Sequence, residues 1–162
     1  MDTLAPRAAR IAERLAARKE TLAVAEGSAG GLISAALLAV PGASAFFLGG
    51  AVIYTAQARA GLLDIGKAEM AHIRPATEAY AQLFAERIRT RLGATWGLGE
   101  AGAAGPTGNR YGDPAGHSCL AVAGPRPLVV TLRTGSADRA GNMALFAERA
   151  LVLLDQALHA EI

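Results

Sequence analysis

The chain has 162 residues, enough for one domain with a substantial core, and 52% of them are hydrophobic although only 5% are aromatic. Lysine and arginine number 16 against 14 aspartate and glutamate, and no basic run stands out, so the charge pattern does not support nucleic-acid binding. The single cysteine, Cys119, excludes a disulfide framework within the chain and is typical of a reducing compartment, so we expect a cytoplasmic protein.

Membrane insertion is not expected either. Charges interrupt each apolar run of the amino-terminal segment, which excludes a secretory signal there. No charge occurs from Gly27 to Ala58, but Pro41-Gly42 and Gly49-Gly50 divide that stretch into pieces shorter than the roughly 20 apolar residues that a spanning helix needs.

The first half of the chain alternates helical and strand patterns. Apolar residues at helical spacing predict an amphipathic helix from Leu4 to about Lys19. The run Thr21–Ala25 predicts a buried strand, and a helix follows from about Gly30 to Ala39. Ala45–Thr55 has the pattern of a strand with a glycine-marked bend, and a short helix covers about Gln57–Leu63.

The second half ends in a hairpin and a helix. Apolar residues at every fourth position predict a helix over Pro75–Leu92, and Ala94–Ala101 predicts a strand. Residues 117–124 and 127–134 predict two strands joined by the turn GPRP, and a final helix begins at about Asp138. We therefore predict a single-domain α/β protein over residues 1–162, a three-layer α/β/α sandwich with a mixed sheet.

The first glycine-rich loop, AEGSAGG (Ala25–Gly31), lies between a predicted strand and a predicted helix. A helix N-terminus presents free N–H groups and partial positive charge, so the loop is a candidate anion site. Its spacing matches neither GxxxxGK[ST] nor GxGxxG. The alternative is a structural turn in which Ser28 caps the helix.

The second glycine-rich loop, GAAGPTGNRYGDPAGHS (Gly102–Ser118), is long and has no apolar periodicity. Such connections are usually functional or disordered. Its Arg110, Tyr111, Asp113 and His117 favour ligand binding, and the alternative is an ordered surface loop. The three scattered histidines and one cysteine have no metal-ligand spacing, so we expect no metal site.

In chain order these segments resemble the C-terminal domain of the competence/damage-inducible protein CinA, a family that includes nicotinamide mononucleotide deamidases. The motif AESCTGG of that family appears as AEGSAGG, and PGSSxxFxGGxxxY appears as PGASAFFLGGAVIY (Pro41–Tyr54). Its TGxAGPxGG loop corresponds to AGAAGPTGN, and GxR near the last helix corresponds to GSADR (Gly135–Arg139). The resemblance extends over nearly the whole chain.

The resemblance implies metal-independent hydrolysis of a nicotinamide carboxamide, with no cofactor, in a homo-oligomer. It places the serine nucleophile at Ser44, the tyrosine of the pocket at Tyr54 and the acidic residue of the first loop at Glu26. The family lysine that assists as base is Arg59 here, and guanidinium, with a pKa above roughly 12, makes a poor base. The first serine of AESCTGG is Gly27, and the threonine that opens the second loop is Ala101.

Two functions remain open at this point. In the first, the chain is an amidohydrolase that acts on a pyridine nucleotide or a related small amide with another base, His117 before Glu100 or Glu26. In the second, it is a catalytically impaired nucleotide-binding or regulatory protein on the same scaffold. Both imply a small-molecule ligand, a nucleotide by resemblance, and Arg59, Arg110 and Arg139 are candidate anion-binding residues. The candidate catalytic residues are Ser44, Tyr54 and Arg59, and the candidate ligand-binding residues are Glu26, Gly27, Ser28, Gly30, Gly31, Gly105, Thr107, Gly108, Asn109, Arg110, Tyr111, His117 and Arg139.

Overall fold

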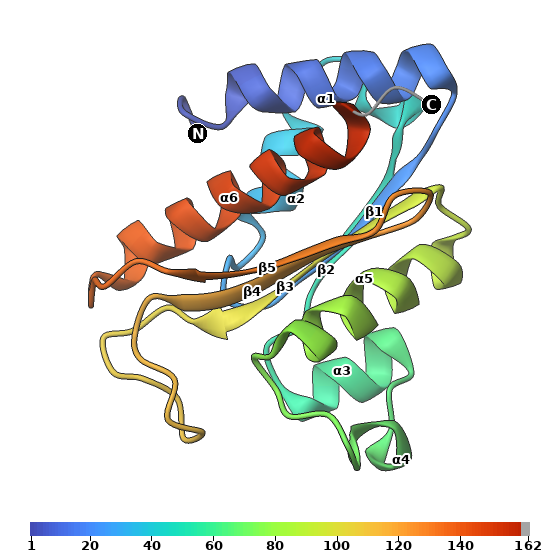
Figure 1. Ribbon diagram of the computed structural model, residues 1–162. Helices are drawn as coiled ribbons and strands as arrows, with labels where there is room; N and C mark the ends of the chain where they lie inside the picture. The colour runs from blue at the N-terminus through green and yellow to red at the C-terminus, as the bar shows by residue number, and fades with distance from the viewer. Residues whose placement is uncertain (160–162) are drawn as a thin grey trace.

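The predicted elements assemble around one mixed sheet in the computed structural model, which describes residues 1–159 (Figure 1). Five strands have the order β2-β1-β3-β4-β5. The strands are β1 (Leu22–Glu26), β2 (Phe47–Val52), β3 (Trp96–Ala103), β4 (His117–Ala123) and β5 (Leu128–Arg133). β1 is parallel to both β2 and β3, whereas β4 and β5 complete the sheet as antiparallel strands.

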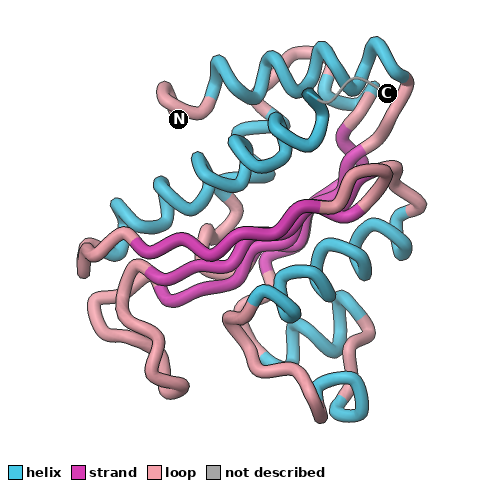
Figure 2. The backbone as a smooth tube through the Cα atoms, in the orientation of Figure 1, coloured by secondary structure: helices cyan, strands magenta, loops and turns pink. Residues whose placement is uncertain are grey.

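Helices cover both faces of the sheet, which gives the three layers seen in Figure 2. The helices are α1 (Ala5–Arg18), α2 (Leu32–Leu38), α3 (Ala56–Leu63), α4 (Lys67–Met70), α5 (Glu78–Leu92) and α6 (Arg139–His159), with a 3₁₀ turn η1 (Ala43–Ala45). α1, α2 and α6 lie over one face, and α3, α4 and α5 lie over the other. The predicted α/β/α sandwich with a mixed sheet is confirmed.

Small residues allow α5 to lie directly on the central strands. A Cβ at Gly97 would lie 2.0 Å from the carbonyl oxygen of Ala85, and one at Gly99 would lie 2.2 Å from that of Ala81. On the other face, α6 packs over fully buried aliphatic residues such as Leu98 and Leu120. Each such side chain contributes about 1.5–3 kcal/mol through burial. Close approach on one face and aliphatic packing on the other explain how an aromatic-poor chain fills its core.

Helix boundaries differ from the sequence-based prediction where caps decide them. α5 begins at Glu78 rather than Pro75 because the Thr77 hydroxyl accepts a hydrogen bond from Tyr80 N at 3.3 Å. The short helix α4 was not predicted. β2 begins at Phe47, because the preceding residues form η1. No helix within residues 1–159 combines the length and apolar character needed to cross a membrane.

The sheet topology brings both glycine-rich loops to the same end of the strands. The carboxyl ends of the parallel strands β1, β2 and β3 meet there, since Glu26 pairs with both Val52 and Glu100. Residues after Glu26, after Val52 and after Ala103 therefore lie side by side. Binding sites of open α/β sheets commonly form at this end of the strands.

Candidate functional site

Glu26 caps helix α2 from within the protein. Its carboxylate accepts hydrogen bonds from Gly31 N at 2.7 Å, Ile33 N at 3.1 Å and Ser34 N at 2.8 Å, and from the Ser34 hydroxyl at 2.8 Å. Gly31 has φ of 99°, a left-handed conformation that favours glycine and turns the chain into the helix. Glu26 is fully buried. Its charge thus occupies the helix N-terminus that an external anion would otherwise use.

Glu100 on β3 accepts the hydrogen bonds that the earlier part of the first loop donates. It accepts hydrogen bonds from Gly27 N at 3.0 Å and Ala29 N at 2.8 Å, from the Ser118 hydroxyl at 2.7 Å, and from the Ser28 hydroxyl. Burial raises the pKa of the Glu100 carboxyl above its usual range, and the hydrogen bonds from Ser28, Ala29 and Ser118 oppose that rise. Glu100 therefore acts as an internal acceptor under the loop.

Our expectation of free N–H groups in the first loop is corrected by these contacts. Gly27, Ala29 and Gly31 donate to the two carboxylates, and Gly30 N donates to the Gly27 carbonyl at 3.1 Å. Ser28 does not cap α2, because its hydroxyl donates a hydrogen bond to Glu100 instead. Glu26 accepts the N–H groups at the start of α2 and Glu100 accepts those of the loop before it, so the chain supplies its own acceptors here.

The second loop is held in shape by Asn109 and Asp113. The Asn109 side chain accepts from Tyr111 N at 3.0 Å and Asp113 N at 3.1 Å, and donates to the Asp113 carboxylate at 2.8 Å. Arg74, from the segment between α4 and α5, donates to both Asp113 oxygens at 2.7 and 3.3 Å. The hydrogen bond from Arg74 lowers the pKa of Asp113 to about 2. This Arg74–Asp113 clasp, which the sequence analysis missed, ties the loop to the α4–α5 segment.

The clasp places Arg110 and Tyr111 at the wall of a cleft of about 420 Å³. The guanidinium carbons of Arg74 and Arg110 both lie 5.2 Å from the centre of the Tyr111 ring. We call this hollow the tyrosine–arginine cleft, and its lining residues are Tyr54, Thr55, Ala56, Arg59, Met70, Ile73, Pro75, Tyr80, Arg110 and Tyr111. Its residues come from the ends of β2 and β3 and from the α3–α5 side of the molecule.

Arg59 of α3 has no acidic partner in this cleft. Its Nη1 donates to the Tyr80 hydroxyl at 3.3 Å, and its guanidinium carbon lies 5.8 Å from the centre of the Tyr80 ring. Its Nε is buried without a hydrogen-bond partner in the described part of the chain. No Asp or Glu within residues 1–159 forms an ion pair with it. A buried donor without an acceptor is unusual in a folded protein.

Arg139 connects the start of α6 to the residues that follow β2 and β3. Its Nη2 donates to the Tyr54 hydroxyl at 3.3 Å, and its Nη1 donates to the Gly105 carbonyl. Tyr54 is 69% exposed and lines the cleft. The structure thus brings Tyr54, Arg59, Arg110, Tyr111 and Arg139 together. Thr107 and Gly108 lie exposed on the second loop. A Cβ at Gly108 would lie 2.2 Å from the Asp113 carbonyl oxygen, so the close approach of the backbone requires glycine there.

Ser44 lies at the opposite end of the sheet. It is exposed in η1, just before β2 begins, whereas Tyr54 follows the end of the same strand. Six residues of extended strand separate the two positions by roughly 20 Å. Our expectation that Ser44 faces the loops within one chain is therefore wrong.

His117 does not replace the missing base in this arrangement. It is 4% exposed at the start of β4, with Nε2 at 2.8 Å from the Ala76 carbonyl oxygen and 3.7 Å from Asp113. Its ring therefore helps to attach the second loop to the α4–α5 segment rather than facing the cleft. The fully buried Glu26 and Glu100 are likewise occupied. None of the three expected substitutes for the family lysine reaches the tyrosine–arginine cleft.

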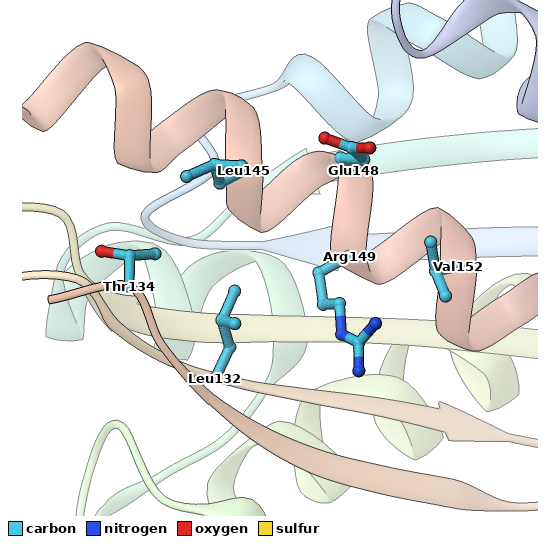
Figure 3. Close-up of a pocket in the computed structure, with 6 residues that line it drawn as sticks. All are labelled: Leu132, Thr134, Leu145, Glu148, Arg149 and Val152. Carbon is cyan, nitrogen blue, oxygen red and sulfur yellow. The ribbon is translucent and has the colours of Figure 1, made fainter. Parts of the chain in front are cut away.

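A second hollow, of about 350 Å³, lies between β5 and α6 (Figure 3). It is lined by Leu132, Thr134, Leu145, Glu148, Arg149 and Val152. None of the site residues expected from the sequence lines it, and Glu148 neighbours its one arginine along α6. Within residues 1–159 no group of three or more His, Cys, Asp and Glu side chains is arranged to hold a metal ion. The tyrosine–arginine cleft is therefore the better candidate site.

Sequence analysis missed Tyr80 and Arg74. Tyr80 belongs to the apolar repeat of α5, which indicated only a core position, and burial raises the pKa of its hydroxyl although Arg59 opposes this. Arg74 meets Asp113 across 39 residues of chain, and no local pattern indicates such a pair. Cys119 is 1% exposed, and burial raises the pKa of its thiol.

Comparison with known proteins connects this geometry to one family. The family model for the CinA C-terminal domain matches residues 4–158. A CinA-like protein of Anaeromyxobacter sp. (strain K) is 38% identical over 148 residues, which cover 91% of this chain and 36% of the relative. One from Synechococcus sp. (strain CC9902) is 40% identical over 123 residues, which cover 76% of this chain and 29% of the relative. The chain spans about a third of the length of these curated relatives.

Solved structures show the same fold over nearly the whole chain. The competence damage-inducible protein A of Klebsiella pneumoniae superimposes with a TM-score of 0.90 at 28% identity, covering 98% of this chain and 99% of that one. A competence/damage inducible protein of Agrobacterium tumefaciens gives a TM-score of 0.89 at 27% identity, covering 98% and 96%. Both likenesses are to crystal structures of proteins named for competence or damage induction.

Proposed function

The chain belongs to the CinA C-terminal domain family, and we propose that it binds a pyridine nucleotide, or a related small amide that carries a phosphate, in the tyrosine–arginine cleft. The observation that carries this proposal is the Arg59 side chain, which is half-buried at the cleft with an unpartnered Nε and no acidic partner within residues 1–159. We also infer a cytoplasmic location from the single cysteine.

Charge supports a phosphate-bearing ligand. Arg59 and Arg110 line the cleft, and Arg139 contacts Tyr54 at its wall. The described hydrogen bonds of these arginines go to tyrosine hydroxyls or a carbonyl oxygen rather than to carboxylates. Guanidinium groups bind phosphate oxygens with strong, charge-assisted hydrogen bonds. A dianionic phosphate would neutralise the positive charge of these arginines and provide an acceptor for Arg59.

The aromatic side chains of the cleft favour a ligand that contains a flat, cationic ring. Tyr54, Tyr80 and Tyr111 all line the cleft, beside the apolar Met70 and Ile73. The face of a tyrosine ring attracts a cation, and aromatic rings stack on one another with offset geometry. The pyridinium ring of a nicotinamide nucleotide has both properties. Tyrosines and arginines at one cleft therefore match the two ends of such a ligand.

A matched pair of ligands tests the proposal by calorimetry. Nicotinamide mononucleotide and nicotinamide riboside differ only in the phosphate. We expect the mononucleotide to bind at least about tenfold more tightly, because one charge-assisted hydrogen bond contributes about 1.5–3 kcal/mol. Raising the salt concentration should reduce that preference, since it screens exposed charges. Equal affinity for the two ligands, or no binding of either, would contradict the proposal.

A second candidate function is hydrolysis of the carboxamide of the bound ligand. Tyr54 and Ser44, the residues that the family resemblance assigns to chemistry, are both present, and Tyr54 lies in the cleft beside Arg139. In this reaction water adds across the amide, the C–N bond breaks, and a carboxylate and ammonia are formed. The base is the open question, because Arg59 stands in place of the family lysine and does not give up its proton.

Ammonia release from nicotinamide mononucleotide distinguishes the two candidates. Binding without turnover in the native chain, with turnover gained in the Arg59→Lys/Gly27→Ser double variant, would support a binding protein derived from a hydrolase. A Cβ at Gly27 would lie 3.1 Å from the Ile53 carbonyl oxygen, so the added serine requires only a small local shift. Native turnover that Ser44→Ala abolishes would instead support the hydrolase, and turnover that survives Ser44→Ala would exclude the proposed nucleophile.

A further inference from the structure

Strand β5 forms one free edge of the sheet, because it pairs only with β4 within residues 1–159. Just beyond the paired residues, Thr134 N donates to the Gly116 carbonyl at 3.0 Å. Since successive N–H groups of a strand point to opposite sides, the N–H and C=O groups of Val129, Thr131 and Arg133 face away from β4. Apart from Arg133 at its end, the sequence LVVTLR contains neither charge nor proline, the usual means of protecting a free edge. The strand can therefore pair with a further one.

Two hollows lie beside this edge, between β5 and α6. The first is the hollow of about 350 Å³ shown in Figure 3, and Leu132 and Thr134 supply its strand side. The second, of about 580 Å³, is lined by Arg126, Leu128, Asp155, Gln156 and His159. Alternate residues of the strand and residues at helical spacing along α6 line both hollows. We call the two together the β5–α6 groove, which follows the whole length of β5.

The Leu132 end of the groove is largely apolar. Leu132, Leu145 and Val152 line it, and Leu145 is 45% exposed. Exposed apolar side chains gathered in one hollow are typical of a surface that binds a protein segment. Glu148 and Arg149 are also exposed there, and their opposite charges leave this end close to neutral. This end therefore favours apolar side chains of a partner.

The opposite end of the groove, near Arg126, is positively charged. Asp155 is the only acidic residue that lines the second hollow in the described part of the chain. Arg7 and Arg14 contact its carboxylate at 3.0 and 2.8 Å, and Arg10 lies 3.9 Å from it. Arg126 is exposed and forms no ion pair within residues 1–159. Four arginines thus accompany a single aspartate, and this excess of positive charge favours an acidic partner.

We propose that the β5–α6 groove binds an extended segment of another protein, which pairs with β5 as a sixth strand of the sheet. Side chains of an added strand alternate between its two faces, so every second one reaches the groove. Backbone hydrogen bonds supply affinity in this mode of recognition, and side chains in the groove supply specificity. The segment carries apolar residues at alternate positions and an acidic residue beside Arg126. The groove and the tyrosine–arginine cleft are lined by different residues, so the inference does not depend on the proposed function.

A pair of peptides tests the chemistry of the partner by fluorescence anisotropy. Both peptides alternate leucine and threonine between their ends, and one has an aspartate at each end where the other has a lysine. Identical ends allow either strand direction, because the Leu132 end of the groove is close to neutral. We expect saturable binding of the aspartate peptide and at least about tenfold weaker binding of the lysine peptide. Equal affinities, or no binding of the aspartate peptide, would overturn the proposal.

Backbone methylation of the aspartate peptide distinguishes an added strand from a peptide that binds through side chains alone. An N-methyl group removes one N–H donor and blocks close approach at that position. Because every second N–H of an added strand faces β5, methylation at alternate positions should weaken binding about tenfold or more, and methylation at the positions between them should have little effect. A uniform loss along the peptide, or no loss at any position, would exclude pairing with β5.

Charge reversal in the protein tests the positive end of the groove. We expect Arg126→Glu to weaken binding of the aspartate peptide about tenfold and to strengthen binding of the lysine peptide, because attraction and repulsion are exchanged. Arg91→Glu, at an exposed position of α5, is the matched control and should leave both affinities at their native values. Thermal unfolding shows whether both variants are folded. Equal changes in the two variants would mean that the peptides do not bind beside Arg126.

The apolar end is tested in the same way, and sedimentation identifies the occupant. Leu145→Asp places a charge in the groove and should weaken binding of the aspartate peptide at least about tenfold, whereas Leu38→Asp, at a 61% exposed position of α2, should have no effect. Similar affinities for the two variants would contradict binding in the groove. A native chain that sediments as a dimer and is dissociated by Leu145→Asp alone would show that a second copy occupies the groove, which would overturn the proposed partner.

Discussion

The two glycine-rich loops lie at the same edge of the sheet, but their charges are arranged in opposite ways. The first loop surrounds two buried glutamate side chains, Glu26 and Glu100, which accept hydrogen bonds from the N–H groups of Gly27, Ala29 and Gly31. The second loop carries Arg110 beside the cleft, where the described contacts of the arginines include no carboxylate apart from the Arg74–Asp113 clasp. The first loop therefore contains its own acceptors, whereas the arginine beside the second loop has no carboxylate, and we propose that an anion binds there.

This difference shows that glycine content does not identify an anion site. A helix N-terminus binds an anion when its N–H groups are free, and an acidic side chain from a neighbouring strand can occupy them first. The decisive features are which side chains lie beneath the loop and whether each donor already has an acceptor. The following substitutions test this comparison.

The largest expected loss of stability comes from a substitution beneath the first loop. Glu26→Ala removes the acceptor of Gly31 N, Ile33 N and the Ser34 side chain together. We expect a loss of about 3–5 kcal/mol of unfolding free energy in urea, because each buried donor without a partner costs about 1–3 kcal/mol and water reaches some of them. Glu86→Ala is the control, because Glu86 is exposed and its ion pair with Arg89 contributes less than about 1 kcal/mol. Similar losses for both variants would remove the structural role of Glu26.

On the cleft side, Arg59→Met should affect binding rather than stability. Losing one charge-assisted hydrogen bond to phosphate weakens binding of nicotinamide mononucleotide about 10- to 100-fold, and it should weaken binding of nicotinamide riboside much less. Calorimetry with both ligands measures the difference. Arg133→Met, an exposed arginine at the end of β5, is the matched control and should retain native affinity. A uniform loss for both ligands would show that Arg59 does not bind the phosphate.

Asp113→Asn tests whether the clasp maintains the second loop. We expect a loss of roughly 1–2 kcal/mol in stability at neutral pH, together with a few-fold weaker binding of the mononucleotide, because Arg110 and Tyr111 lose their fixed position. The pKa of Asp113 is lowered in the folded protein from 3.8 to about 2, so its ionisation favours folding. That stabilisation is complete above the unfolded pKa and is lost as the pH falls toward about 2. Unfolding measured between pH 6 and pH 2 should show a smaller acid-dependent loss in the variant; an equal loss would contradict this role.

Glu100→Gln should have the smallest effect on stability at neutral pH. The amide oxygen can still accept from Gly27 N and Ala29 N, and the hydroxyls of Ser28 and Ser118 can turn to accept from the amide nitrogen. The pKa of Glu100 is raised in the folded protein, so its ionisation opposes folding, and this part of stability is lost as the pH rises above the ordinary value of 4.5. Urea unfolding at pH 4 and pH 8 should therefore show less decline in the variant than in the native chain. Identical declines would mean that Glu100 does not retain its proton on folding.

The position of Ser44 shows what a motif can and cannot predict. The resemblance places Ser44 and Tyr54 in one motif, but their separation in space was already indicated by the strand predicted between them. An extended strand advances about 3.3 Å per residue, so residues before and after it lie at opposite ends of the sheet. The predicted strand Ala45–Thr55 and the expectation of one shared pocket were inconsistent within a single chain.

The sequence by itself determined the order of the main elements and the three-layer fold. These follow from hydrophobic periodicity and from strand direction, which are local properties that a linear pattern records. Only the tertiary structure decided that Glu100 lies beneath the first loop, that Arg74 holds Asp113, and that Arg59 has no acidic partner. The reason is physical: the protonation and pairing of a charged side chain depend on what packs around it, and those neighbours come from distant parts of the chain.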